Sequence, residues 1–170
     1  MAKNEVDDLT QKTIEKGGLM VKLYFDMHAG ADTDLQAVMA DLINNRLLKA
    51  NGVLYCFGSI DEPIKDKDML TTSAIVTALI NSLENTMNVV FTFAPAAIEV
   101  IKPEGEYRIR QSELQNTLVS LSSISVNYSE YILKRVMGAG DYERIKGDIK
   151  AREDLGKKVM GKGQDPGTPG

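Results

Sequence analysis

The segment from Leu19 to Met27 alternates between apolar and mixed positions along its whole length. Successive side chains of a β-strand point to opposite sides of the sheet, so a period of two indicates a strand with one apolar face. The pattern predicts a sheet that helices cover on one side only. The apolar face carries Leu19, Val21, Leu23 and Phe25, and the other face carries Met20, Lys22, Tyr24 and Asp26.

Strand and helix patterns then continue to residue 101. Apolar residues recur at helical spacing from Leu35 to Leu47, after Thr33 and Gln36, which fit a capping box. A second helix is expected over 83–94 and a charged loop over 61–68. Further strands are expected at 53–60, 70–80 and 96–101. The order β-α-β-β-α-β predicts an α+β fold, a ferredoxin-like βαββαβ sandwich with an antiparallel sheet.

A long helix is expected after this unit. Residues 107–109 suggest a short edge strand, and a wide apolar stripe predicts a helix from Ser112 to Val136. The expected organisation is therefore a polar N-terminal arm over 1–17, a single α+β domain over 18–137, and a charged helix with a disordered Gly/Pro tail over 138–170.

Composition narrows the classes of function. Residues 18–137 hold 14 acids and 10 bases, so they lack the basic excess with which proteins bind nucleic acids. No apolar run approaches the roughly 20 residues that span a bilayer, and residues 1–8 are too polar for a signal peptide. A single cysteine, Cys56, suits a reducing compartment. We expect a cytoplasmic protein without a nucleic-acid or membrane partner.

The end of the first predicted strand carries the chemically richest cluster. Asp26 and the only histidine, His28, could support acid–base chemistry and are the candidate catalytic residues, while Tyr24 and Asp32 are candidates for ligand binding. Helix capping already accounts for Asp32 and Asp34, and a histidine at a strand end is commonly a partly solvated loop residue. No second His or Cys has the spacing of zinc ligands, so we expect neither a metal site nor a cofactor.

Other chemical signatures point to structural roles. The acids in the 61–68 loop alternate with Lys65 and Lys67 and lack the spacing of a calcium loop, so a solvated loop is expected. Cys56 lies between aromatic neighbours and is expected to be a buried structural thiol. Tyr128 and Tyr131 have the spacing of a core or subunit contact. The sequence contains none of the glycine-rich phosphate loops or common nucleophile motifs.

Three short segments carry a resemblance. They are Thr72-Ser73-Ala74, Ala94-Pro95-Ala96-Ala97-Ile98-Glu99 and Ser129-Glu130-Tyr131-Ile132-Leu133-Lys134. Over about two thirds of its length the chain resembles a small family of uncharacterised archaeal α/β proteins. The resemblance implies a cytosolic, archaeal setting and supplies no catalytic residues.

These observations favour a non-catalytic module that acts by self-association. A sheet covered on one side leaves its other face in need of cover, which either the long helix from Ser112 or a second subunit could supply. We expect a two-fold homodimer, which could also bind a small ligand or a protein partner. Two alternatives remain: an enzyme that uses Asp26 and His28, and a scaffold whose partner binds the 141–157 segment.

Overall fold

The computed structural model describes residues 3–66 and 68–136 together with six positions further on, which are 147, 150, 151, 154, 155 and 158. The chain divides into two compact units, Met1–Ile109 and Arg110–Gly170, and each is described by itself. Apart from those six positions, the predicted charged helix and Gly/Pro tail of 138–170 and the 141–157 segment lie outside the described residues.

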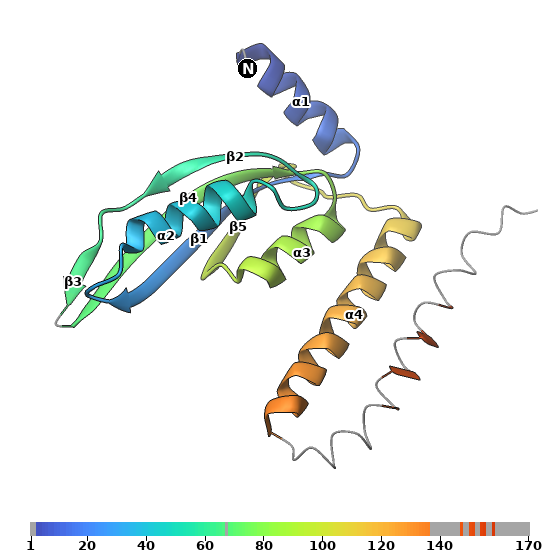
Figure 1. The fold of residues 1–170 in the computed structure, drawn as a ribbon. Helices are drawn as coiled ribbons and strands as arrows, with labels where there is room; N and C mark the ends of the chain where they lie inside the picture. Colours follow the sequence, from blue (N-terminus) through green and yellow to red (C-terminus); the bar gives the residue numbers. More distant parts are fainter. Residues whose placement is uncertain are drawn as a thin grey trace, which may run out of the picture. The chain divides into compact units, whose positions relative to one another are not determined.

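Antiparallel strands form one five-stranded sheet in the first unit (Figure 1). The main strands lie in the order β2-β4-β1-β5, and the short β3 pairs with β4. β1 and β4 stay in register over 12 residues each, from Leu19 opposite Ile80 to Gly30 opposite Met69. The strands are β1 (Leu19–Gly30), β2 (Val53–Ile60), β3 (Ile64–Asp66), β4 (Met69–Ile80) and β5 (Ala97–Lys102).

Helices precede, connect and follow these strands. One precedes β1, one joins β1 to β2 and ends in a π-helical segment, and one joins β4 to β5. A long helix lies in the second unit. The helices are α1 (Lys3–Glu15), α2 (Leu35–Asp41) with the π-helix η1 (Leu42–Leu47), α3 (Leu83–Phe93) and α4 (Gln111–Val136). None of the helices in the described residues is long and apolar enough to cross a bilayer.

One face of the sheet carries the hydrophobic core. The buried residues of β1 are those that the alternating pattern assigned to its apolar face. They form a single cluster with Met39 of α2, Leu47 of η1 and Val89 of α3, so these helices cover the same side of the sheet (Figure 1). Burial of this apolar face is the main force that holds the layers together.

Side-chain caps fix where the two connecting helices begin. The carboxylate of Asp34 accepts a hydrogen bond of 3.0 Å from the backbone N–H of Ala37, so Asp34 is the N-cap of α2. The predicted capping box of Thr33 and Gln36 is therefore wrong: a carboxylate at the N-cap satisfies the free N–H and also interacts favourably with the helix dipole. The hydroxyl oxygen of Ser82 accepts from the N–H of Asn85 at 3.1 Å and begins α3.

The structure confirms the α+β class, the antiparallel sheet and the long C-terminal helix. The more specific ferredoxin-like assignment stays a prediction. The predicted 61–68 loop contains the strand β3, because the chain turns back there and Ile64 pairs with Thr71. Residues 107–109 do not form the expected edge strand. Tyr107 instead packs against the core, and its hydroxyl donates to the carbonyl of Gly17 at 2.8 Å.

Candidate functional site

The side of the sheet opposite the core, which we call the open face, is the candidate site. Strand register arranges its side chains in six rows that cross the strands. From the end nearest α1, the rows are Tyr55, Leu79, Met20 and Lys102; Phe57, Thr77, Lys22 and Glu99; Ser59, Ile75, Tyr24 and Ala97; Ser73 and Asp26; Ile64, Thr71 and His28; and Met69 with Gly30.

Helix α1 covers the first of these rows. Leu79 points away from the core and is nevertheless fully buried. The hydroxyl oxygens of Thr10 and Tyr55 lie 2.8 Å apart. Because the Thr10 hydroxyl donates to the carbonyl of Val6 at 2.7 Å, the Tyr55 hydroxyl is the donor in that contact. Residues 1–17, which the sequence suggested were a polar arm, thus contain a helix that lies on the open face.

Polar side chains occupy the half of the open face that β1 and β5 form. Lys22 Nζ lies 3.4 Å from Glu99 Oε2, and the hydroxyl of Tyr24 donates to the same oxygen at 3.2 Å. These contacts join neighbouring strands at the surface, where a single ion pair contributes little to stability. Tyr24, a candidate ligand-binding residue, is therefore already engaged by Glu99.

The two candidate catalytic residues lie in adjacent rows of the same face. Ser73 Oγ donates to Asp26 Oδ1 at 2.8 Å, and His28 Nδ1 lies 2.9 Å from Thr71 Oγ1. Asp26 and His28 are thus each paired with a hydroxyl of β4. Two residues apart on a strand, their Cα atoms are separated by about 7 Å. This placement orients both side chains but gives no hydrogen-bonded acid–base pair.

Asp32 lies elsewhere. It is an exposed residue of the turn between β1 and α2, next to the N-cap Asp34, so the structure does not bring it onto the open face with Tyr24. Within the residues that the structure describes, no group of three or more His, Cys, Asp or Glu side chains could hold a metal ion.

Apolar side chains occupy the other half of the open face, along β2, β3 and β4. Four large side chains there are exposed, and we call them the apolar strip: Phe57 (61 %), Ile75 (41 %), Ile64 (73 %) and Met69 (47 %). They lie in the second, third, fifth and sixth rows. The strip is not evident in the sequence, because Ile64 stands among the charges of the predicted loop.

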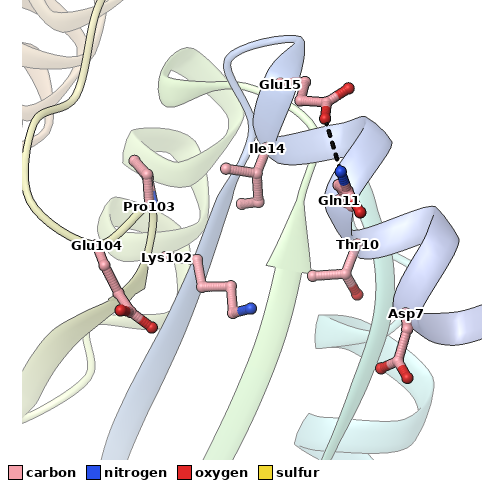
Figure 2. Close-up of a pocket in the computed structure, with 8 residues that line it drawn as sticks. All are labelled: Asp7, Thr10, Gln11, Ile14, Glu15, Lys102, Pro103 and Glu104. Atoms are coloured by element: carbon pink, nitrogen blue, oxygen red, sulfur yellow. Dashed lines mark hydrogen bonds between the residues drawn. The ribbon is translucent and has the colours of Figure 1, made fainter.

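An open groove of about 410 Å³ runs beside α1 (Figure 2). One side is a single face of α1, since its residues recur at helical spacing from Asp7 to Glu15. The other side is the end of β5 and the residues after it, Lys102–Glu104, and Figure 2 shows the Lys102 side chain reaching towards α1. A second cavity of about 320 Å³ lies between η1 and α3. Neither is lined by Asp26 or His28.

Cys56 faces the core side of β2. It is partly buried against the core cluster, and burial raises the pKa of its thiol. A raised pKa keeps the thiol protonated at neutral pH, where the thiolate is the reactive form. Cys56 therefore has the character of a structural thiol.

Comparison with known proteins identifies the family of this chain, and that family is uncharacterised. The model of the MJ0538 family, an uncharacterised family named after a Methanocaldococcus protein, matches residues 7–146, and the chain belongs to this family. The match confirms the predicted resemblance to an uncharacterised family of this kind. No curated protein and no solved structure matches the chain.

Proposed function

We propose that this chain is a non-catalytic module that works by association, and that its open face packs against the open face of a second copy. The apolar strip carries the proposal. Isolated exposed apolar residues are ordinary, but the strip places two neighbouring pairs on one face of the sheet, Phe57 with Ile75 and Ile64 with Met69, and a single polar row separates the pairs. Removing such a patch from water is the principal driving force of protein association.

The size of the open face suits a homodimer. Beyond the row that α1 covers, five rows remain, and at about 3.4 Å per residue they extend about 27 Å along the strands. The second and third rows are four strands wide and the remaining rows two or three, so the mean width is about 14 Å and the flat footprint is roughly 400 Å². Side chains that project from the sheet add to this value, so the accessible area is compatible with the roughly 500 Å² per partner at which specific interfaces begin.

The polar half of the face is compatible with burial. Asp26, His28 and Tyr24 each have a hydrogen-bond partner on a neighbouring strand. Removing a polar group from water costs less free energy when the group keeps its hydrogen-bond partner than when it is left unpaired. Burial of the apolar strip would therefore supply the favourable free energy of association. The hydrogen bonds of the polar residues would limit the free-energy cost of burying the other half of the face.

Two phenylalanines provide a matched test. Phe57 lies in the strip, whereas Phe91 is similarly exposed on α3, which covers the opposite side of the sheet. In sedimentation equilibrium of the full chain across micromolar concentrations, we expect a dimer that Phe57→Ser weakens at least tenfold and Phe91→Ser leaves unchanged. A wild-type chain that is monomeric throughout, or equal weakening by both substitutions, would contradict the proposal.

A cytoplasmic, archaeal setting is part of the same proposal. The single Cys56 is compatible with a reducing compartment, and the family name comes from a Methanocaldococcus protein. Fractionation of cells that express the chain from its own gene tests the location. Recovery in an exported fraction would contradict it.

The alternative that Asp26 and His28 catalyse a reaction remains a prediction. Both described cavities lie away from them, and each side chain bonds to a hydroxyl rather than to the other. The geometry therefore favours association. An activity of the purified chain that is lost in His28→Ala and retained in Thr71→Val would instead favour catalysis.

A further inference from the structure

We infer that the two copies stack with their rows in opposite order, and that α1 sets this arrangement by occupying one end of the interface. The inference rests on the proposed function, because it specifies how the second copy sits on the open face. It follows from the position of α1, from the spacing of the apolar strip and from the dimensions of packed sheets.

Helix α1 lies in the layer that a partner sheet would need. Its contact with the open face is fixed by the hydrogen bond between Thr10 and Tyr55 and by the burial of Leu79 in the first row. Sheets that pack face to face lie about 10 Å apart, and a helix with its side chains is about 10–12 Å across. A partner sheet therefore cannot extend over the first row.

This restriction decides between the two ways of pairing the faces about a two-fold axis. If the rows ran in the same order, the α1 helices of both copies would meet over the same row, in a gap with room for only one. If the rows run in opposite order about an axis through the fourth row, each α1 lies beyond the sixth row of the partner. Both helices then fit, and each marks one end of the interface.

The apolar strip is self-complementary in this order. Reversal about the fourth row places the second row of one copy over the sixth row of the other, and the third row over the fifth. Phe57 then faces Met69 of the other copy, and Ile75 faces Ile64. Within each pair the residues are offset sideways by about one strand spacing, some 4.8 Å, and large side chains on sheets about 10 Å apart can bridge this offset. A methionine beside an aromatic ring is also a favourable contact.

Cross-linking along β4 tests the order of the rows. Thr77, Ser73 and Thr71 all belong to the open face, and none of them is in the strip. In a Cys56→Ser background we would introduce either Ser73→Cys or Thr77→Cys and add a short bismaleimide, because sheets about 10 Å apart are too distant for a direct disulfide. Light scattering of each variant before treatment measures whether the dimer is present.

Opposite order predicts a clear difference between the two variants. Position 73 of one chain lies opposite position 73 of the other at the two-fold axis, so Ser73→Cys should cross-link. The two positions 77 lie about 27 Å apart along the strands, so Thr77→Cys should not cross-link. A mixture of Thr77→Cys with Met69→Cys, on chains of different tag length, should cross-link to a heterodimer. Same-order stacking instead predicts that both single variants cross-link equally.

The possible failures are distinguishable. Equal self-cross-linking at 73 and 77 would overturn the inferred order and leave the proposed function standing. A dimer by light scattering that cross-links at neither position would place the contact on another surface and overturn both. A monomer by light scattering in the Cys56→Ser background and in the unmodified chain would overturn the proposed function itself.

Discussion

The hydroxyl oxygens of Thr10 and Tyr55 lie 2.8 Å apart although 45 residues separate them in the sequence. This contact joins α1 to the edge strand β2. It places the helix over the first row of the open face, above the fully buried Leu79. A face that would otherwise be free along its whole length is thereby closed at one end.

Tyr55→Phe removes this hydrogen bond and keeps the ring. We expect α1 to open more readily, since a partly buried hydrogen bond contributes about 0.5–1.5 kcal/mol. Hydrogen exchange measures this as faster exchange of the α1 amides, by several-fold, with little change in β1 and β4. Tyr24→Phe is the control, because the Tyr24 hydroxyl bonds to Glu99 at an exposed site away from α1. Equal effects of both substitutions would contradict this role of Tyr55.

Gly18 permits the chain to pass from α1 into β1. A Cβ atom at this position would collide with Thr13 Cγ2 and lie 2.7 Å from the carbonyl oxygen of Ile80. Backbone atoms of a central strand cannot easily move, so Gly18→Ala should destabilise the fold by about 1–3 kcal/mol. At Gly30 an added Cβ meets nothing within 4 Å. Urea unfolding should therefore show a clear loss for Gly18→Ala and none of that size for Gly30→Ala.

The strand β1 could be predicted from the sequence because its environment is one-sided. Its apolar residues face the core and its mixed residues face outwards, so the period of two was preserved. The same reasoning failed for α1, whose buried residues include Thr10 and Thr13 rather than large apolar side chains. Val6, Leu9 and Ile14 form only a thin apolar stripe, and the sequence does not reveal that the threonines beside it are buried, because only the fold supplies their partners.

The apolar strip could not be predicted because it depends on register. Ile64 and Met69 flank a charged turn, while Phe57 and Ile75 belong to separate strands. Which of these side chains share a face is set by the pairing of β2 and β3 with β4, and one slip by a single residue would invert it. Asp26 lies within the predicted strand, whereas His28 lies one residue beyond its predicted end, because β1 continues to Gly30. Their partners Ser73 and Thr71 come from β4, about 45 residues later.

Cys56 should make stability depend on alkaline pH. Burial raises the pKa of its thiol above the ordinary value of 9.0, so the folded state favours the protonated form. This contribution is complete below pH 9.0 and is lost as the pH rises through the folded pKa. In urea unfolding, the difference in stability between wild type and Cys56→Ala should shrink from pH 8 to pH 10. A difference that stays constant or grows would contradict the effect of burial.

The negative charge of Asp26 lies in the inferred dimer interface, and a substitution that neutralises it tests that arrangement. In the opposite-order arrangement the fourth row lies on the two-fold axis, so the two Asp26 carboxylates face each other across the interface. Because both side chains project into the gap between the sheets, the two charges are closer than the sheet spacing of about 10 Å and repel by at least about 1 kcal/mol. Asn at this position retains the acceptor for Ser73 Oγ. We therefore expect Asp26→Asn to lower the dimer Kd several-fold in sedimentation equilibrium.

The matched control for this charge change is Asp32→Asn. Asp32 is exposed in the turn before α2 and lies outside the open face, so its neutralisation alters the net charge by the same amount without relieving the contact at the axis. Added salt should tighten the wild-type dimer by screening the two carboxylates and should affect Asp26→Asn less. If both substitutions tighten the dimer equally, net charge is responsible. If Asp26→Asn weakens the dimer, Asp26 meets a donor or a cation across the interface, and the axis does not pass through its row.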